Sequence, residues 1–217
     1  MKTPSGITGF DDFLEGGYEN SSLNMIYGPG ASGKTTFCLC FGIFLAKQGK
    51  KVIFIDTENS LSLERISQIA FESNIEDILE KIVIFKPKSF LEQHKLIISL
   101  GKTLKKSSIA GIIVDTIGFY YRAQSKEGSL NSYLAKQLAD LKYLSSKKDI
   151  PIILTNQVYS DINIENKINL VGGEMVKNWC TYLIELKKNR TRKAVIHKPF
   201  KKEVVFCIEN KGISIIR

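Results

Sequence analysis

The sequence predicts an α/β fold in which a mostly parallel central sheet is flanked by helices and finished by antiparallel C-terminal strands. Two short apolar runs, Lys51–Asp56 and Ala110–Asp115, indicate buried strands. Between such runs lie longer segments whose apolar residues recur at helical spacing. A glycine-rich stretch, Gly28–Thr35, precedes the first long helix. Buried strands that alternate with amphipathic helices are typical of parallel sheets covered on both faces.

The first fifty residues predict a short helix, a strand and a long helix. Thr8 is a candidate N-cap for a helix over Gly9–Glu15, because a threonine oxygen can accept from the first free amides of a helix. Leu23–Tyr27 predicts a strand. The glycine-rich stretch then leads into a helix over Lys34–Lys47.

The middle of the chain continues the alternation. Apolar positions between Leu61 and Ala70 follow a helical period. Further on, the sequence predicts a strand, two helices and a last buried strand: Ile82–Phe85, Ser89–Lys105, Gly128–Lys147 and Pro151–Asn156.

The pattern changes after residue 173. Short apolar segments separated by turn residues indicate four successive strands, Trp179–Lys187, Lys193–His197, Glu203–Glu209 and Ile213–Ile216. Short turns favour antiparallel pairing, so we expect these strands to extend the sheet. No linker, repeat or low-complexity segment interrupts the sequence, and we expect one domain over residues 1–217.

Composition excludes several classes of protein. With 43% hydrophobic and 24% charged residues the chain is not intrinsically disordered. It shows no signal-peptide pattern and no run of apolar residues long enough to span a membrane, so we expect a cytoplasmic protein. Cys38, Cys40, Cys180 and Cys207 match neither a zinc motif nor a disulfide framework, which suits a reducing compartment.

Positive charge is concentrated at the C-terminal end. The net charge is +9, and residues 187–217 hold ten Lys or Arg against two Glu, a net charge of +8. Such a concentration favours a polyanion such as nucleic acid, although a solvated lysine-rich surface would look the same. The candidate phosphate contacts are Lys187, Lys188, Arg190, Arg192 and Lys193.

The stretch GPGASGKT fits the phosphate-loop motif G-x-x-x-x-G-K-[ST] in full, between a predicted strand and a predicted helix. Loop amides and the helix N-terminus form an anion cradle. Lys34, expected on the solvent side of the loop, would reach the β- and γ-phosphates, and the Thr35 hydroxyl would ligate Mg²⁺. The sequence therefore predicts ATP and Mg²⁺ on Gly28, Pro29, Gly30, Ala31, Ser32, Gly33, Lys34, Thr35 and Thr36.

Acidic residues follow two of the predicted strands. Asp115 ends a buried strand, where a carboxylate can join the Mg²⁺ site; the alternative is a cap for the turn at 116–118. Hydrolysis also needs a carboxylate that orients water beside the γ-phosphate. Asp56, Glu58 and Glu64 are all candidates for that role on chemistry alone.

Gln157 ends the last buried strand on the same expected edge of the sheet. An amide there can donate to the γ-phosphate and relay its presence to the loop that follows. The alternative is a polar residue that only caps a buried strand.

Four stretches together resemble the core of the RecA-type recombinases in their archaeal and eukaryotic branch: TGFDDFLEGGYENSSLNMIYGPGASGKTTFC, FIDTENSLSLERI, IIVDTIGFYYR, and TNQV followed by GGEMVKNW. The resemblance implies a RecA-like P-loop NTPase core. It implies that Glu58 is the catalytic glutamate and that Arg65 lies against the adenine. It also implies that Arg122 belongs to a first DNA loop and that residues 158–171 form a second.

The chain departs from the full recombinases in three places. The stretches that match begin close to residue 1, so we expect no N-terminal helical domain and no polymerisation linker, as in the short archaeal paralogues. Residues 158–171 hold one Lys, two acids and no Arg, a poor composition for a DNA loop. His197 sits where a recombinase residue covers the neighbouring subunit's nucleotide, and we expect a surface histidine.

The resemblance implies an ATP- and DNA-binding paralogue that assists homologous recombination and repair with low ATP turnover. Its expected partners are single-stranded DNA and a full-length recombinase or other repair proteins, with homo-oligomerisation allowed. The alternative is a switch or motor ATPase of the same superfamily with robust turnover. A small-molecule kinase is disfavoured because the sequence offers no identifiable lid or acceptor site.

Overall fold

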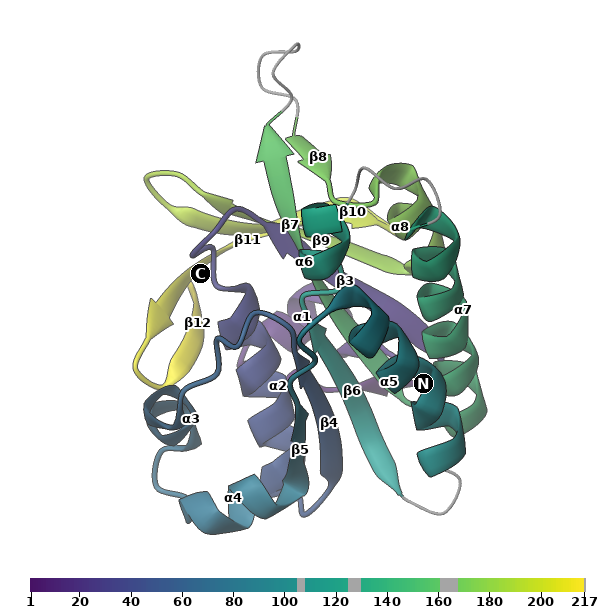
Figure 1. The fold of residues 1–217 in the computed structure, drawn as a ribbon. Coiled ribbons are helices and arrows are strands. Elements are labelled where there is room, and N and C mark those ends of the chain that lie inside the picture. The colour runs from purple at the N-terminus through teal and green to yellow at the C-terminus, as the bar shows by residue number, and fades with distance from the viewer. Residues whose placement is uncertain (105–107, 125–129, 161–167, 217) are drawn as a thin grey trace.

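The computed structural model describes residues 1–104, 108–124, 130–160 and 168–216 (Figure 1). Within these residues, ten strands form one sheet. In sheet order the path runs β12 (Gly212–Ile216), β11 (Lys202–Glu209), β10 (Arg192–Lys198), β9 (Tyr182–Lys188), β3 (Ser22–Gly28), β7 (Pro151–Ser160), β6 (Ile109–Asp115), β4 (Lys51–Asp56) and β5 (Ile82–Phe85). The tenth strand, β8 (Ile168–Leu170), pairs antiparallel with β7.

The parallel part of the sheet is larger than predicted. β3, β7, β6, β4 and β5 are parallel, as expected, and β9 also pairs parallel with β3. The predicted strand over Trp179–Lys187 is therefore present as β9, but it begins only at Tyr182 and pairs antiparallel on one side alone, with β10. Trp179 ends a helix, α8 (Gly173–Trp179). This helix returns the chain to the edge at which β3 begins, so β9 can start there at Tyr182 and run parallel to β3. The antiparallel part is β10, β11 and β12.

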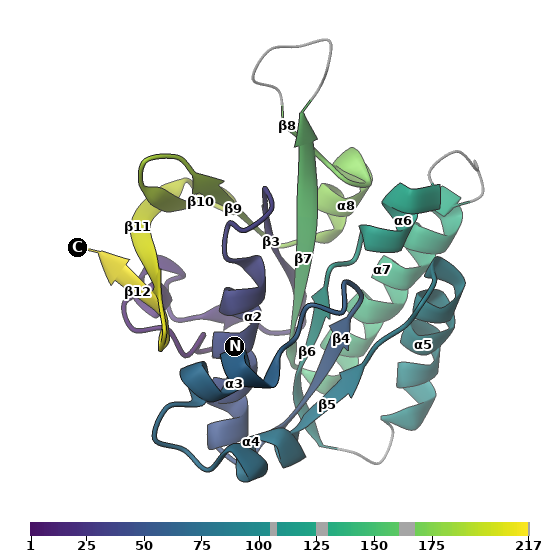
Figure 2. The ribbon, with the colours of Figure 1, turned by 60° about the vertical axis from the view of Figure 1, so that its left-hand side comes forward.

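Helices cover both faces of the sheet, as predicted (Figures 1 and 2). One face carries α2 (Lys34–Lys47), α3 (Leu63–Ala70) and α4 (Ile75–Lys81), whose apolar side chains share one core cluster. The opposite face carries α5 (Phe90–Thr103), α7 (Leu130–Lys148) and α8, which share a second cluster. Two short helices, α1 (Phe10–Phe13) and α6 (Phe119–Gln124), complete the set among the described residues.

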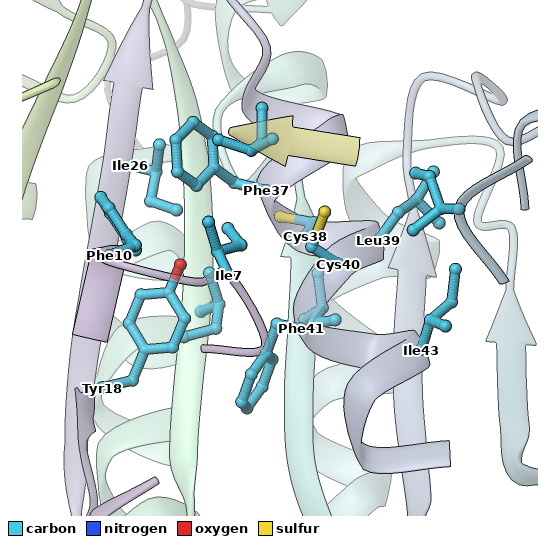
Figure 3. Packing of buried hydrophobic residues seen from close by; sticks show 14 of the residues in the cluster. Ile7, Phe10, Tyr18, Ile26, Phe37, Cys38, Leu39, Cys40, Phe41 and Ile43 are labelled. Carbon is cyan, nitrogen blue, oxygen red and sulfur yellow. The ribbon is translucent and has the colours of Figure 1, made fainter. Parts of the chain in front are cut away.

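The core around α2 holds the start of that helix in place (Figure 3). The Phe37 ring lies 4.9 Å from that of Phe10 and 5.2 Å from that of Phe206, so α1 and β11 enclose it. The Tyr18 ring packs edge-on against Phe41 at 5.2 Å. Burying one such ring stabilises a fold by about 1.5–3 kcal/mol. This packing fixes the helix that leaves the glycine-rich loop, and therefore fixes the loop.

Several local predictions need correction. Thr8 is not the N-cap of α1; Gly9 holds that position at φ 79, without a side-chain cap bond, and only glycine adopts that backbone without strain. Ser89 is the N-cap of α5, its Oγ accepting from the Glu92 amide at 3.1 Å. Lys105 and Gly128, predicted at helix ends, lie outside the described residues. The elements that periodicity missed are all short: β1 (Lys2–Thr3), β2 (Tyr18–Glu19), α4, α6, β8 and α8.

Two predictions from composition can be compared with the structure. The four cysteines are free thiols, as expected. In the described part of the chain, no helix combines the length and the apolar character that crossing a membrane requires.

Candidate functional site

The glycine-rich loop connects the carboxyl end of β3 to the N-terminus of α2, as the sequence predicts. Gly28 backs onto β9, where a Cβ would lie 2.4 Å from the Leu186 carbonyl oxygen, so no larger residue fits. Gly33 has φ +111, and Ala31 adopts φ 57 in the left-handed region. The loop is thus bent by two residues with positive φ and pressed against the C-terminal strands.

A cavity of about 330 Å³ opens above this loop. Its lining combines the loop with residues in or just after β4, β6, β7 and β11: Gly30, Ala31, Ser32, Gly33, Lys34, Thr35, Thr36, Glu58, Asp115, Thr116, Gln157 and Ile208. The structure therefore brings together most of the predicted nucleotide-site residues, all of the predicted metal ligands and all three predicted catalytic side chains. Gly28, Pro29 and Arg65 do not line this cavity.

The loop has the features of a phosphate cradle. The Ser32 Oγ is fully buried and has no hydrogen-bond partner among the described residues, so a polar group is missing at that point. A Cβ on Gly30 would meet nothing within 4 Å, which leaves open space on the loop. The first turn of α2 contains no acidic residue, so nothing opposes an anion at its N-terminus. These observations fit a bound phosphate chain.

Lys34 occupies a different position from the one predicted. The side chain is buried, with 8% of the residue exposed, and its Nζ donates to the carbonyl oxygens of Gly28 at 3.0 Å and Pro29 at 2.9 Å. Burial lowers the pKa of Lys34, while nearby Asp115 and Glu58 oppose this shift. The expectation of a solvent-side ammonium is wrong because the folded loop offers two carbonyl acceptors within reach of the amine.

Asp115 lies at the end of β6, directly opposite Thr35. The Thr35 Oγ1 donates to Asp115 Oδ2 at 2.7 Å, and the Thr155 hydroxyl of β7 donates to the other carboxylate oxygen. Burial raises the pKa of Asp115, and the hydrogen bonds from Thr155 and Thr35 work in the opposite direction. The carboxylate therefore faces the loop, and its metal role stays a prediction. Nothing in the sequence selects Thr155, because its contact with Asp115 depends on β7 lying beside β6.

The site offers few protein ligands to a metal. No group of three or more His, Cys, Asp or Glu residues suited to a metal lies in the described ranges. Mg²⁺ commonly binds through one or two protein oxygens and takes its other ligands from phosphate and water. The Thr35 hydroxyl and the Asp115 carboxylate fit that pattern.

Glu58 follows β4 and turns into the cavity. Its Oε1 accepts from the Gln157 Nε2 at 2.8 Å and from the Thr116 Oγ1 at 3.2 Å. These donors come from β7 and from the residue after β6. Gln157 is not at the predicted strand end, because β7 continues to Ser160; it lies inside β7, opposite the last residue of β3. Glu58 and Gln157, which the sequence predicts separately, are in direct contact.

The structure separates Glu58 from the other two acids. The buried Asp56 carboxylate accepts from the amides of Ser60 at 3.0 Å and Leu61 at 3.1 Å. It therefore shapes the turn that carries Glu58. Glu64 lies on α3, where its Oε1 accepts from Gln68 at 3.3 Å, and it does not line the cavity.

Arg65 lies on α3 beside the turn between β11 and β12. Its guanidinium donates to the carbonyl oxygens of Glu209 at 2.9 Å and Asn210 at 3.1 Å. β11, which carries Glu209, also carries Ile208. The Ile208 side chain lines the cavity and lies 3.0 Å from the position of a Cβ on Gly33. Sequence reasoning missed Ile208, since nothing local shows that β11 folds over the loop.

The residues predicted to contact DNA fall in two places. Arg122 is exposed on α6 and lines a second cavity of about 290 Å³ with Phe119 and Gln157. Gln157 thus borders both cavities. Of the predicted second DNA loop, residues 161–167 lie outside the described residues.

The five predicted basic contacts lie on β9, β10 and the turn between them. Lys187 Nζ lies 3.6 Å from Glu185, and Lys193 Nζ lies 2.8 Å from Glu203. Arg192 Nη1 donates to the Ala31 carbonyl oxygen at 2.8 Å. Lys188 and Arg190 are exposed at the tip. The five residues are therefore not equivalent, although their spacing in the sequence suggests one surface.

His197 has an acidic partner at the protein surface. Its Nε2 lies 2.7 Å from Glu185 Oε2, and its ring lies 6.3 Å from that of Tyr27. The side chain is 40% exposed, which agrees with the expected surface histidine.

Comparison with known proteins gives a consistent result. The Rad51 family matches residues 1–215. Three similar proteins are named DNA repair and recombination protein RadB. That of Methanobrevibacter smithii is 35% identical over 84% of this chain and 80% of its own length. That of Methanococcoides burtonii is 39% identical over 87% and 84%, and that of Thermococcus kodakarensis is 39% identical over 74% and 72%.

The fold comparison agrees with the family match. A solved structure described as the crystal structure of the RadB recombinase has a TM-score of 0.85 and 34% identity, and the match covers 100% of both chains. This likeness confirms the predicted RecA-like core, with its mostly parallel sheet and antiparallel C-terminal strands. The chain belongs to the Rad51 family, in which it groups with the proteins named RadB.

Proposed function

We propose that this chain binds ATP with Mg²⁺ in the cavity above the phosphate loop. One observation carries the proposal: two hydrogen-bonded pairs of polar side chains line the same cavity as the phosphate loop. Thr35 and Asp115 form one pair, and Glu58 and Gln157 form the other. Phosphoryl transfer needs groups that hold the phosphates, a divalent cation and a water molecule, and these side chains are of the types that can do so.

Each group has a distinct task in binding. The amides of residues 30–35 and the buried Ser32 hydroxyl receive the phosphates. Lys34 exchanges its two carbonyl acceptors for phosphate oxygens, which are stronger partners for an ammonium. Thr35 and Asp115 hold Mg²⁺, which supplies neutralisation of the phosphate charge when bound. We assign Arg65, as the resemblance implies, to the adenine side of the site, where its guanidinium now contacts the turn after Ile208.

Glu58 is the residue that we assign to water activation. Its Oε1 is already engaged by Gln157 and Thr116, so one of its two oxygens is not free to accept from water. We propose a low rate of ATP hydrolysis, as the resemblance to the short recombinase paralogues implies. Gln157 acts on Glu58 directly, and its place between the two cavities suits a residue that responds to the γ-phosphate.

We further propose that the chain binds DNA, single-stranded in preference, and assists recombination and repair as a single cytoplasmic core domain. The names of its relatives support a role in DNA repair and recombination. The exposed cations Arg122, Lys188 and Arg190 support a contact with DNA. A full-length recombinase or another repair protein would be the partner. Lysine and arginine at a tip act on the phosphate backbone and read little sequence.

Two measurements test this function together. Calorimetric titration with Mg·ATP measures nucleotide binding, and a steady-state turnover assay with and without single-stranded DNA measures hydrolysis. We expect saturable binding, slow turnover and a DNA complex. Robust turnover without any DNA complex would instead favour a switch or motor ATPase of the same superfamily, and no Mg·ATP binding would refute the nucleotide site.

A further inference from the structure

Arg192 belongs to the basic hairpin of β9 and β10, yet its guanidinium is directed to the phosphate loop. Nη1 donates to the Ala31 carbonyl oxygen at 2.8 Å. The two residues are 161 positions apart in the sequence, so only the fold brings them together. Figure 2 shows the β9–β10 hairpin of the sheet near the N-terminal end of α2.

The strand that carries Arg192 is held on both sides. Arg192 pairs with Lys188 on β9 and with Phe206 on β11. β9 in turn backs onto Gly28, and β11 brings Ile208 against Gly33. The C-terminal strands therefore touch the loop at its start, its middle and its end. The contacts at Gly28 and Gly33 are steric, whereas Arg192 donates a charged hydrogen bond to the Ala31 carbonyl oxygen.

The conformation of Ala31 gives this contact a purpose. Amides that converge on a phosphate require the neighbouring carbonyls to point away from it. Those carbonyls then need other partners, because an unpaired polar group is costly. Ala31 also adopts φ 57, a region that a residue with a Cβ occupies at a cost. A donor that holds the Ala31 oxygen on the outside favours this shape of the loop.

We propose that Arg192 is a positioning residue of the nucleotide site. It holds the Ala31 carbonyl outward and thereby keeps the loop in the shape that receives the phosphates of a nucleoside di- or triphosphate. This inference rests on the proposed nucleotide binding. It also removes Arg192 from the DNA contacts, since the guanidinium is already engaged with the loop.

The test compares Arg192→Gln with Lys201→Gln, a control that removes an exposed positive charge from the turn between β10 and β11. Titration of the full chain with Mg·ATP gives the affinity. We expect Arg192→Gln to weaken binding about fivefold to tenfold, as for loss of one charge-assisted hydrogen bond. Lys201→Gln should change the affinity less than about twofold, as expected for an exposed charge. Arg192→Lys should restore part of the loss, because a lysine can donate one such bond.

A second readout separates loop position from long-range charge. In amide NMR spectra recorded without nucleotide, Arg192→Gln should shift the signals of Gly30, Ala31 and Ser32 and leave that of Gly49 in place. Lys201→Gln should leave all four signals in place. Equal loss of affinity in both glutamine variants, or unchanged loop signals in Arg192→Gln, would overturn the proposal. Failure of the wild-type chain to bind Mg·ATP would instead refute the nucleotide site, and the loop signals would still decide the role of Arg192.

Discussion

The Thr35 hydroxyl donates a 2.7 Å hydrogen bond to the Asp115 carboxylate across 80 residues of sequence. The contact links the first turn of α2 to the carboxyl end of β6. Its geometry is set by the sheet, since Asp115 pairs with Asp56 of β4 at the last position of that ladder. The two residues that we assign to Mg²⁺ are thus placed by different parts of the core.

Replacing Asp115 by Asn should stabilise the protein in the absence of nucleotide and remove the Mg²⁺ dependence of ATP affinity. Burial raises the pKa of Asp115 above that of an unfolded carboxyl. A group shifted in this direction costs no stability at low pH, where it is protonated in both states, and costs stability as pH rises through its folded pKa. The advantage of Asp115→Asn should therefore grow as the pH rises above about 4, the ordinary pKa of a carboxyl group.

Thermal unfolding at several pH values, with and without Mg·ATP, measures both effects of Asp115→Asn. A suitable control is Asp140→Asn, which removes a carboxylate on α7 paired with Lys136 at 2.8 Å. Should Asp115→Asn show the same Mg²⁺ dependence as the wild type, Asp115 would not be a metal ligand.

Lys34→Ala should weaken ATP binding by one to two orders of magnitude. A charge-assisted hydrogen bond contributes about 1.5–3 kcal/mol, and about 1.4 kcal/mol is a tenfold change in affinity. The substitution also leaves the carbonyls of Gly28 and Pro29 without the ammonium, so calorimetry should be paired with an unfolding measurement. Lys47→Ala, at the exposed end of the same helix, is the control and should bind normally. Unchanged ATP affinity in Lys34→Ala would contradict the assignment.

Glu58→Gln should abolish ATP hydrolysis and leave ATP affinity nearly unchanged. Glu58 is assigned to the water and not to the nucleotide, so its loss should appear in the rate and not in the dissociation constant. The glutamine can still accept from Gln157, which preserves the local contact. Glu64→Gln makes the same charge change on α3, outside the cavity, and should keep the wild-type rate. Wild-type turnover in Glu58→Gln would leave Glu58 a structural role only.

The parts of the site that the sequence predicts are those that depend on local pattern. The loop is a contiguous motif, and Asp115 and Gln157 each end an apolar run. Parallel strands align their carboxyl ends, so residues at those ends meet without further information. Glu58 needed more, because Asp56 and Glu64 are chemically equivalent to it. The resemblance to recombinases selects Glu58. In the structure Glu58 lines the cavity, whereas Asp56 accepts from two amides.

The missed features depend on the order of strands or on short elements. Thr155 reaches Asp115 only because β7 lies beside β6, and Ile208 reaches the loop only because β11 folds over it. α8 has seven residues, too few for a helical period to stand out, so its end was merged with the strand that follows. The five basic residues between Lys187 and Lys193 do not form one uniform basic surface. Acidic partners on neighbouring strands, such as Glu203 for Lys193, already pair with some of them.

The DNA contact should reside in the exposed tip of the hairpin. Changing Lys188 and Arg190 together to Gln should weaken single-stranded DNA binding and lower the slope of log affinity against log salt by roughly 1.4, about 0.7 for each neutralised phosphate. Changing Lys187 and Lys193 to Gln removes the same net charge. It should alter the slope far less, because Glu185 and Glu203 already lie within 3.6 Å and 2.8 Å of those amines.

The comparison of the two double variants decides where DNA binds, because both change the net charge by the same amount. Fluorescence anisotropy with a labelled oligonucleotide at several salt concentrations gives the slope for each, and Mg·ATP affinity should stay at the wild-type value in the tip variant. Equal slopes in both variants would mean that only the overall charge matters. Wild-type DNA affinity in the tip variant would move the contact to Arg122, which is exposed on α6 beside the cavity that Gln157 also borders. Arg122→Gln would then be expected to weaken DNA binding in a chain whose hairpin residues are unchanged.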